Sequence, residues 1–245
     1  MKEDTNILSH YDTKRRTAFT LAEILITLGI IGVVSAITMP MLITHYQKQA
    51  TVNQLKKAYS EFSQAVKMAE IDHGLMETWN FEGFNTALER NTYFGENYLL
   101  PYLKVVEKCI PSSSKCWADE IRNVSGNIVT GSVINSVNTR VSFITASGYS
   151  GFYWLNGDGL GIWYWVDLNG PKKGSNRLGR DIFGFHIGWG ANSSSGRSTL
   201  NNLTRDEIKE HCIDKGEIYY SFLDGSYCAD LIIFDGWKIA PDYPW

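Results

Sequence analysis

The segment from Phe19 to Met39 constrains the fold of this chain more than any other feature. It is an apolar run that carries one charge, Glu23, and the basic residues Lys14–Arg16 precede it. A helix of about 20 residues rises about 30 Å, the thickness of the hydrocarbon core of a bilayer. The run therefore predicts one transmembrane helix, and the basic residues predict that the chain beyond Pro40 lies outside the cytoplasm.

Glu23 is the residue in this run that needs an explanation. A carboxylate near the middle of a membrane helix costs about 2.5–3.5 kcal/mol on insertion scales, so a lone acid there indicates a function. Three interpretations are open. The run is a signal sequence cut after the small residues Val34-Ser35-Ala36; it is a plain anchor that tolerates the acid near the interface; or the chain is cut between Ala18 and Phe19, and the run becomes the mature N-terminus.

A family resemblance favours the third interpretation. The hexapeptide Ala18-Phe19-Thr20-Leu21-Ala22-Glu23 resembles the processing site of type IV pilins and type II secretion pseudopilins. The resemblance implies that a prepilin peptidase removes the basic leader, residues 1–18, that Phe19 is then N-methylated, and that Glu23 guides assembly. The family usually has glycine where this chain has Ala18, and alanine is also a small residue.

The resemblance also implies the partners and the location of the chain. The partners would be the prepilin peptidase/N-methylase, copies of this chain or sibling pilins, an assembly platform with its ATPase, and the membrane. The chain would start as a single-pass protein of the bacterial inner membrane with an extracytoplasmic head. It would then enter a filament, a type IV pilus on the cell surface or a type II secretion pseudopilus in the periplasm.

Charge pairing explains the acid on this interpretation. Cleavage before Phe19 creates an α-amino group that is mostly protonated at neutral pH. The carboxylate of Glu23 on a neighbouring subunit can neutralise that cation, and removal of one partner of a buried pair typically costs about 3–5 kcal/mol. We therefore expect Glu23 to be a docking group rather than a catalyst.

The end of the apolar run favours local unwinding. Gly32 and Pro40 bracket a stretch rich in β-branched residues, which have weak helix propensity. Small residues such as Gly32 also let helices approach closely, which is a simpler explanation for them. Related filaments unwind between equivalent positions, and Pro40 matches the proline of that family, so the resemblance implies helix melting between these two residues.

The residues after Pro40 predict an amphipathic helix over 40–74, which continues the transmembrane segment 19–39. Apolar residues recur every three or four positions, and Gly74 is a plausible C-cap. We expect this apolar stripe to pack on the sheet of a globular head, residues 75–245. The stripe consists of Val52, Leu55, Tyr59, Phe62, Val66 and Ala69.

The head is predicted to contain short helices and an antiparallel sheet. Residues 78–106 mix aromatic residues with helix formers, which indicates one or two short helices. Thr204 and Glu207 have the spacing of a capping box that opens a helix through His211. The β-prone runs separated by glycine-rich turns predict strands: 127–130, 140–145, 151–155, 161–167, 182–187, 218–223 and 229–234.

These patterns predict an α+β, pilin-like fold, in which a long N-terminal helix packs on an antiparallel meander. Asn156-Gly157-Asp158-Gly159 is a strong turn signal between two of the strands. The net charge of −3 argues against broad binding to nucleic acid, which usually needs a basic surface.

All four cysteines lie in the exported part of the chain. Outside the cytoplasm an even number of cysteines suggests disulfides, and the spacing favours two local loops, Cys109–Cys116 and Cys212–Cys228, among three possible connectivities. A tetrathiolate zinc site is the alternative. Neither pair has the short CxxC spacing of structural zinc sites.

A calcium site is one interpretation of the glycine-rich loop after residue 166. Asp167, Asn169 and Asp181 supply oxygen ligands, and Asp-x-Asn-Gly resembles calcium loops. Major pseudopilins of type II secretion bind calcium near this part of their fold. An ordinary Asx turn explains the same residues equally well. Four cations in the loop would repel a dication: Lys172, Lys173, Arg177 and Arg180.

Aromatic residues crowd two of the predicted strands. Side chains alternate between the two faces of a strand, so we expect one set to be core and the other to form cross-strand pairs. If the second set were exposed, it would mark a site for sugar or a partner surface. The residues are Tyr149, Phe152, Tyr153, Trp154, Trp163, Tyr164 and Trp165.

We expect no catalytic residues. Gly148-Tyr149-Ser150-Gly151 lacks the final glycine of a nucleophile elbow, and the histidines have no paired metal spacing. The alternative functions are a membrane-anchored extracytoplasmic binding protein with a non-polymerising anchor, which would recognise carbohydrate or a surface, and a secreted hydrolase released after Ala36.

Overall fold

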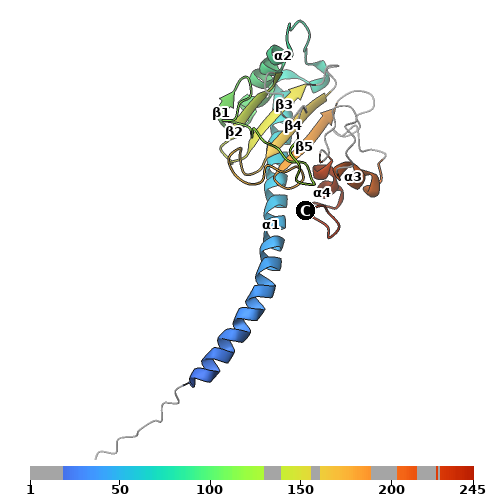
Figure 1. Ribbon diagram of the computed structural model, residues 1–245. Coiled ribbons are helices and arrows are strands. Elements are labelled where there is room, and N and C mark those ends of the chain that lie inside the picture. Colours follow the sequence, from blue (N-terminus) through green and yellow to red (C-terminus); the bar gives the residue numbers. More distant parts are fainter. Residues whose placement is uncertain (1–18, 130–138, 156–160, 189–202, 214–224, 226) are drawn as a thin grey trace, which may run out of the picture. The chain divides into compact units, whose positions relative to one another are not determined.

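The structure is a computed structural model of residues 1–245, and it describes all of them except 1–18, 130–138, 156–160, 189–202, 214–224 and 226 (Figure 1). The chain divides into two compact units, residues 1–46 and 47–245. Helix α1, Leu21–His73, contributes residues to both units.

In the first unit, the described residues belong mainly to the apolar start of α1. Their large apolar side chains, including Phe19 and Ile37, are exposed. Among the described residues, α1 is the one helix that is long and apolar enough to cross a membrane. Because a cytoplasmic protein rarely exposes so large an apolar surface, this segment is a candidate membrane anchor.

The helix continues through Pro40 without a break in its assigned bounds. Proline has no N–H to donate within the helix. Two threonine hydroxyls donate to backbone carbonyls on either side of it, Thr38 Oγ1 to Val34 O at 2.9 Å and Thr44 Oγ1 to Pro40 O at 2.9 Å. The helix melting predicted between Gly32 and Pro40 concerns a filament, and the isolated chain is helical there.

In the second unit, α1 contributes the predicted apolar stripe to the core. Its buried residues are Val52, Leu55, Ala58, Phe62, Ala65, Val66 and Ala69. Phe62 stacks on Tyr164 of the sheet with ring centroids 3.9 Å apart, and Tyr59 lies 5.3 Å from Phe185. The helix ends at His73, and Gly74, the expected C-cap, has a φ of +84° that favours glycine.

Short helices follow, as the composition of residues 78–106 predicts. They are η1 Met76–Thr78, α2 Ala87–Phe94, the π-helical turn η2 Gly95–Leu99 and η3 Leu100–Tyr102. A capping box of Thr86 and Glu89 opens α2. Gly95 is required at its position, because an added Cβ would lie 1.6 Å from the Tyr153 hydroxyl.

The sheet is a five-stranded antiparallel meander in the order β1-β2-β3-β4-β5 (Figure 1). Its strands are β1 Val105–Cys109, β2 Val141–Thr145, β3 Ser150–Leu155, β4 Gly161–Asp167 and β5 Ile182–Gly188. The structure thus has the predicted α+β class, with a long N-terminal helix and an antiparallel sheet.

Two predictions about the strands were wrong. Strand β1 was missed, because its charged residues Glu107 and Lys108 suit an exposed edge and weaken the β-prone pattern. Residues 127–130 form no strand over the described part, where Ile128 makes a single bridge to Arg122. The predicted turn at 156–159 lies outside the described residues.

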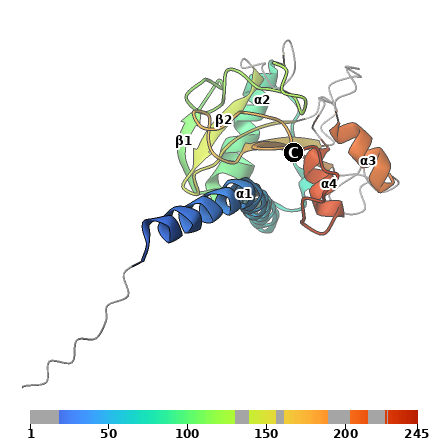
Figure 2. The same ribbon diagram turned by 60° about the horizontal axis from the view of Figure 1, so that its bottom comes forward.

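The C-terminal part contains two helices, α3 Arg205–Cys212 and α4 Cys228–Phe234, which lie side by side (Figure 2). The capping box of Thr204 and Glu207 opens α3 as predicted. The Cys212–Cys228 disulfide joins the two helices. Arg205 of α3 also donates to Asp235 at 2.6 Å, just after the end of α4.

The prediction of a strand over 229–234 was wrong, because these residues belong to α4. A short continuous apolar run fits a buried helix as well as a strand. Here Ala229, Leu231 and Ile232 are buried while Phe234 is exposed, which is a helical pattern. The predicted strand 218–223 lies outside the described residues.

Register defines the two sides of the sheet. Tyr153, Tyr164 and Phe185 pair across β3, β4 and β5 and lie on the side that packs against α1, which we call the helix side. The neighbouring register row, Ser142, Phe152, Trp165 and Gly184, lies on the opposite side. We call this the outer side, and it also carries Ser150 and Asp167.

Candidate functional site

Glu23 lies in the first turn of α1 and forms a capping box with Thr20. Its Oε2 accepts from Thr20 N at 2.8 Å and from Thr20 Oγ1 at 2.9 Å, and Glu23 N donates to Thr20 Oγ1 at 3.2 Å. The sequence analysis missed this box, although the T-x-x-E spacing was available to predict it. One carboxylate oxygen, Oε1, makes no hydrogen bond to the described residues, so it remains available to a cation.

The other residues of the predicted processing and melting sites show little contact. Phe19 is 82% exposed, and Ala18 lies outside the described residues. An added Cβ at Gly32 would meet no atom within 4 Å. Contacts within the chain therefore do not require glycine at this position.

The predicted calcium loop brings Asp167 and Asp181 together at the ends of β4 and β5. Asp181 is buried and accepts from Ser175 N at 2.9 Å and Ser175 Oγ at 3.2 Å, and its other oxygen accepts from Arg177 N. These bonds fix the loop around the carboxylate. Gly174 completes the turn, with a φ of +84° and a position where a Cβ would lie 2.5 Å from Asp181 Oδ2.

Asn169 decides the chemistry of this loop. One end of its side-chain amide lies 2.6 Å from Lys173 O, 2.9 Å from Asp167 Oδ1 and 3.3 Å from Gly170 O, all of them acceptors. If the amide nitrogen faces them, it donates to all three. If the oxygen faces them, the nitrogen donates to Asp181 Oδ2 at 3.4 Å. The amide oxygen and the three acceptor oxygens then lie close together, and no hydrogen bond links them.

Asp167 is fully buried, and its Oδ2 has no hydrogen-bond partner among the residues that the structure describes. Its Oδ1 accepts from Asn169 N at 3.3 Å, as in an Asx turn. Burial, and then the charge of Asp181, raise the pKa of Asp167 to about 7. A cation beside the carboxylate would remove both penalties.

The residues of this loop fit a calcium ion in one arrangement. Among the described residues, no three His, Cys, Asp or Glu side chains gather as metal ligands. Calcium also binds amide and backbone oxygens, and Asp167, Asn169, Gly170 and Lys173 would supply four here. The arrangement uses Asp181 to orient the loop rather than as a direct ligand.

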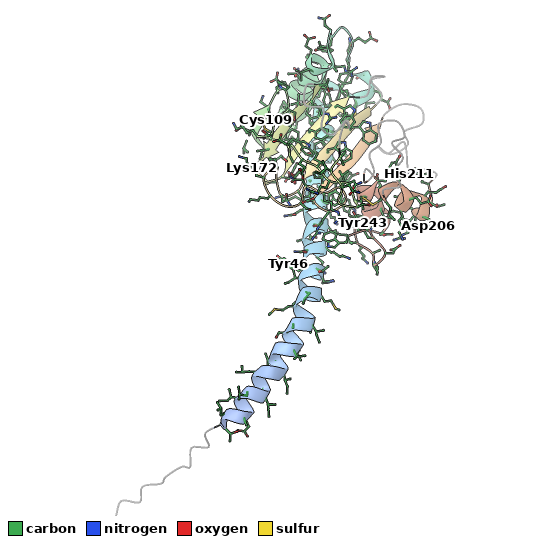
Figure 3. The ribbon with its side chains drawn as sticks, in the orientation of Figure 1. Tyr46, Cys109, Lys172, Asp206, His211 and Tyr243 are labelled. Carbon is green, nitrogen blue, oxygen red and sulfur yellow. A yellow bond between two sulfur atoms is a disulfide. The ribbon has the colours of Figure 1, made fainter. Side chains whose placement is uncertain are left out.

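The basic side chains of the loop do not converge on this oxygen cluster. Arg177 donates through Nε to Val124 O at 2.8 Å. Arg180 lies over the ring of Trp245 at 5.3 Å. Lys172 and Lys173 are exposed, and Figure 3 labels the first of them. Repulsion from these four cations is therefore weaker than the sequence suggests.

The strand aromatics are mostly core, on both sides of the sheet. Tyr149, Phe152, Tyr153, Tyr164 and Trp165 are buried, whereas Trp154 and Trp163 are half-buried. These two tryptophans stack with ring centroids 5.7 Å apart and an interplanar angle of 16°. Cross-strand pairing thus explains most of the aromatic residues, as expected, and leaves one pair at the boundary of the core.

Arg140, immediately before β2, is a functional candidate that the sequence analysis missed. It is only 2% exposed, and its guanidinium carbon lies 4.5 Å from the ring centroid of Phe152 and 5.0 Å from that of Trp154. Its Nη2 has no hydrogen-bond partner in the described part of the chain. No sequence signal identifies such a residue, because an arginine before a strand is usually exposed.

Most buried polar atoms without a partner lie on the outer side of the sheet. The described residues include eight such atoms. Five belong to Arg140, Ser142, Ser150, Trp165 and Asp167, and a sixth, Trp117 Nε1, belongs to a ring 4.5 Å from Phe152. The two others belong to Arg90 and Asn176.

The cysteines form two disulfides, Cys109–Cys116 and Cys212–Cys228, and none is free. These are the two local loops that the spacing favours. Cys109 lies at the end of the edge strand β1 (Figure 3). The thiolates required by a tetrathiolate zinc site are therefore consumed.

Comparison with known proteins gives one match. Residues 41–147 match a family described as "Family of unknown function (DUF6613)". The matched stretch includes Arg140 and the Cys109–Cys116 disulfide, and it excludes Glu23 and Asp167. No curated protein and no solved structure matches the chain.

Proposed function

We propose that this chain is a prepilin-like structural subunit that a prepilin peptidase cuts before Phe19. The mature subunit would be N-methylated at Phe19 and would assemble through α1 with copies of itself or with sibling pilins. An assembly platform with its ATPase would extract it from the bacterial inner membrane into a type IV pilus or a type II secretion pseudopilus. The chain itself would catalyse no reaction.

The observation that carries this proposal is the division of α1. Its apolar start is exposed along its length with one acid, Glu23, whereas residues 52–69 of the same helix form part of a core with an antiparallel sheet. A plain anchor needs no acid, and a signal sequence needs no continuation into the core. A subunit that moves from a bilayer into a helical filament needs both features.

The capping box refines the proposed role of Glu23. Oε2 is engaged by Thr20, and Oε1 makes no hydrogen bond to the described residues. In our proposal Thr20 orients the carboxylate, and Oε1 receives the α-amino group of a neighbouring Phe19. Pairing in a medium of low dielectric favours both charges.

The first experiment is mass spectrometry of the N-terminus after co-expression with a prepilin peptidase. We expect a chain that starts at N-methylated Phe19. A chain that keeps Met1 would instead support the membrane-anchored binding protein. A chain that starts at Ile37 would support a secreted protein and contradict the proposal.

A second experiment separates docking from capping. Glu23→Gln keeps a hydrogen-bonding side chain for the capping box but removes the charge. We expect it to be processed normally and to be absent from sheared filaments. The matched comparison is Thr20→Ala, which loses the box and keeps the charge, and it should assemble better than Glu23→Gln. Equal incorporation of Glu23→Gln and wild type would contradict the docking role.

We also propose that the loop from Asp167 to Asp181 binds calcium. The unpaired Oδ2 of buried Asp167 and the convergence of oxygens at Asn169 support this proposal. Calcium would close the turn that follows β4 by neutralising these oxygens. Asp181 would hold the loop in place through Ser175 and Arg177.

Thermal unfolding of the full chain in detergent tests the calcium proposal. Calcium at about 100 times its dissociation constant stabilises a protein by about 2.7 kcal/mol. We expect the melting temperature to rise in calcium relative to a chelator, and Asp167→Asn to remove the rise. Asp206→Asn, on the first turn of α3, is the control and should keep it. Equal melting temperatures in wild type would mean that the Asn169 nitrogen faces the acceptors.

A further inference from the structure

The guanidinium of Arg140 is a buried cation without a counter-ion among the described residues. Its side chain makes no ion pair and no hydrogen bond to those residues, and Nη2 is buried. Desolvation lowers the pKa of Arg140 to about 9, so the group is still charged at neutral pH. Buried charges in proteins are usually paired, because an unpaired one costs several kcal/mol.

The backbone holds this cation in a fixed position. Ser112 N donates to Arg140 O at 2.9 Å. On the preceding residue, Thr139 O accepts from Asn91 Nδ2 at 2.6 Å. Asn91 is itself buried in α2 and accepts from Leu155 N at 3.0 Å. Such preorganisation is typical of a binding residue, because little entropy is lost when a ligand arrives.

The surroundings of Arg140 combine a buried interior with an accessible rim. Phe152 is buried under its guanidinium, whereas Trp154 is half-buried and Thr139 is exposed. Trp154 stacks on Trp163, which is also half-buried. The guanidinium therefore lies where the covered part of the outer side ends, beside two half-buried indole rings that stack on each other.

The buried polar atoms near Arg140 are hydrogen-bond donors, so they favour a negatively charged ligand. Arginine and tryptophan nitrogens only donate hydrogen bonds. Arg140 Nη2, Trp117 Nε1 and Trp165 Nε1 are all buried donors without an acceptor, and Phe152 contacts the side chains that carry them. A group that only accepts, such as a carboxylate, matches these donors, and the arginine fork binds carboxylates in a bidentate manner.

We propose that Arg140 is the carboxylate-binding residue of a site for an acidic saccharide, with the half-buried rings of Trp154 and Trp163 at its rim. A sugar ring presents an apolar face to aromatic rings, and a uronate adds the carboxylate. A long polyanion such as nucleic acid fits less well, because the chain is acidic overall. This site is independent of filament assembly.

The test is a titration of the full chain in detergent micelles with trigalacturonate, followed by tryptophan fluorescence and calorimetry. We expect saturable binding that weakens at least about tenfold for the fully methyl-esterified trisaccharide, which is neutral, since a charge-assisted bond is worth about 1.5–3 kcal/mol. Binding of an acidic peptide without binding of trigalacturonate would overturn the proposal, and so would no binding to either.

Two variants and one control locate the site. Arg140→Met keeps an apolar stem beside Phe152 and should lose binding at least tenfold. Trp154→Phe should weaken binding and leave the fold intact, because Trp154 is only half-buried. Trp245→Phe changes a tryptophan that contacts Lys48 and Arg180 instead, and its binding should match wild type.

Melting temperature distinguishes a binding arginine from a structural one. If Arg140 serves a ligand, Arg140→Met should melt at or above the wild-type temperature without saccharide, because an unpaired buried charge is removed. Trigalacturonate should then raise the melting temperature of wild type alone. A variant that melts well below wild type, together with a wild type that trigalacturonate does not stabilise, would show a structural arginine and overturn the proposal.

Discussion

The two sides of the sheet both bury aromatic rings, but they differ in whether their buried polar atoms have hydrogen-bond partners. On the helix side, Tyr153 donates from its hydroxyl to Asn91 O at 3.0 Å, and Tyr164 stacks on Phe62. On the outer side, Arg140, Ser142 and Asp167 keep buried polar atoms that have no hydrogen-bond partner among the described residues. The helix side is satisfied by its own chain, whereas the outer side has groups available for ions or ligands.

This difference indicates a division between stability and binding. Unsatisfied buried groups cost free energy, and proteins usually keep them where function requires them. We therefore expect substitutions on the helix side to cost stability. Equivalent substitutions on the outer side should cost little, unless they remove packing.

The largest expected effect is on the helix side. Phe62→Ala removes a fully buried ring that stacks on Tyr164, and we expect it to lower the free energy of unfolding by about 3–5 kcal/mol. Urea denaturation measures this change. Ile71→Ala on the same helix is the control, since Ile71 is 82% exposed. A loss below about 1 kcal/mol would contradict the assignment of this side as the stable core.

The next effect is a pH dependence on the outer side. Asp167 has a folded pKa of about 7, above the unfolded value near 3.9. The folded state therefore keeps a proton that the unfolded state loses, and the free energy of unfolding falls as the pH rises from about 4 to 7. We expect a loss on the order of 2–3 kcal/mol from this group.

Urea denaturation in a chelator at several pH values, with Asp167→Asn for comparison, checks this pH dependence. The variant cannot ionise at this position, so its stability should decline less between pH 4 and 7. Parallel curves for wild type and variant would show that Asp167 does not have the raised pKa.

A smaller effect is expected for Tyr153→Phe on the helix side. The substitution leaves Asn91 O without its hydroxyl donor, and such a loss costs about 1 kcal/mol. The midpoint of chemical denaturation should fall accordingly, with an unchanged slope. If the variant is as stable as wild type, the polar atoms of the helix side are not satisfied in the way described.

The smallest effect is expected for Ser142→Ala on the outer side. Ser142 Oγ is fully buried and has no hydrogen-bond partner within the described ranges, so its removal should change stability by less than about 0.5 kcal/mol or increase it. The same denaturation experiment measures this. A loss above 1 kcal/mol would remove the contrast between the two sides.

The sequence was sufficient to predict the main elements of the fold. Spacing of apolar residues predicted the buried stripe of α1, β-prone runs separated by glycine-rich turns predicted β2 to β5, and the Thr204–Glu207 spacing predicted the start of α3. The prediction from sequence was wrong where a local pattern fits both a strand and a helix. The run over 229–234 fits a strand or a helix, and its disulfide and packing determine the choice.

The candidate sites were predictable only in part. Glu23 and Asp167 have sequence signals, an acid in an apolar run and an Asp-x-Asn-Gly loop. Arg140 has none, because its burial depends on the rings of Phe152 and Trp154 on the neighbouring strand and on Trp117 from another segment. Long-range packing creates that site, and a local pattern cannot predict it.

The Cys212–Cys228 disulfide also changes what proteolysis would do to this chain. A backbone cut between these residues leaves both fragments covalently joined, because the bond spans the cut. The nicked protein would migrate as one species on a non-reducing gel and as two after reduction. The C-terminal helix α4 would therefore stay attached to α3 even after the peptide chain between them is broken.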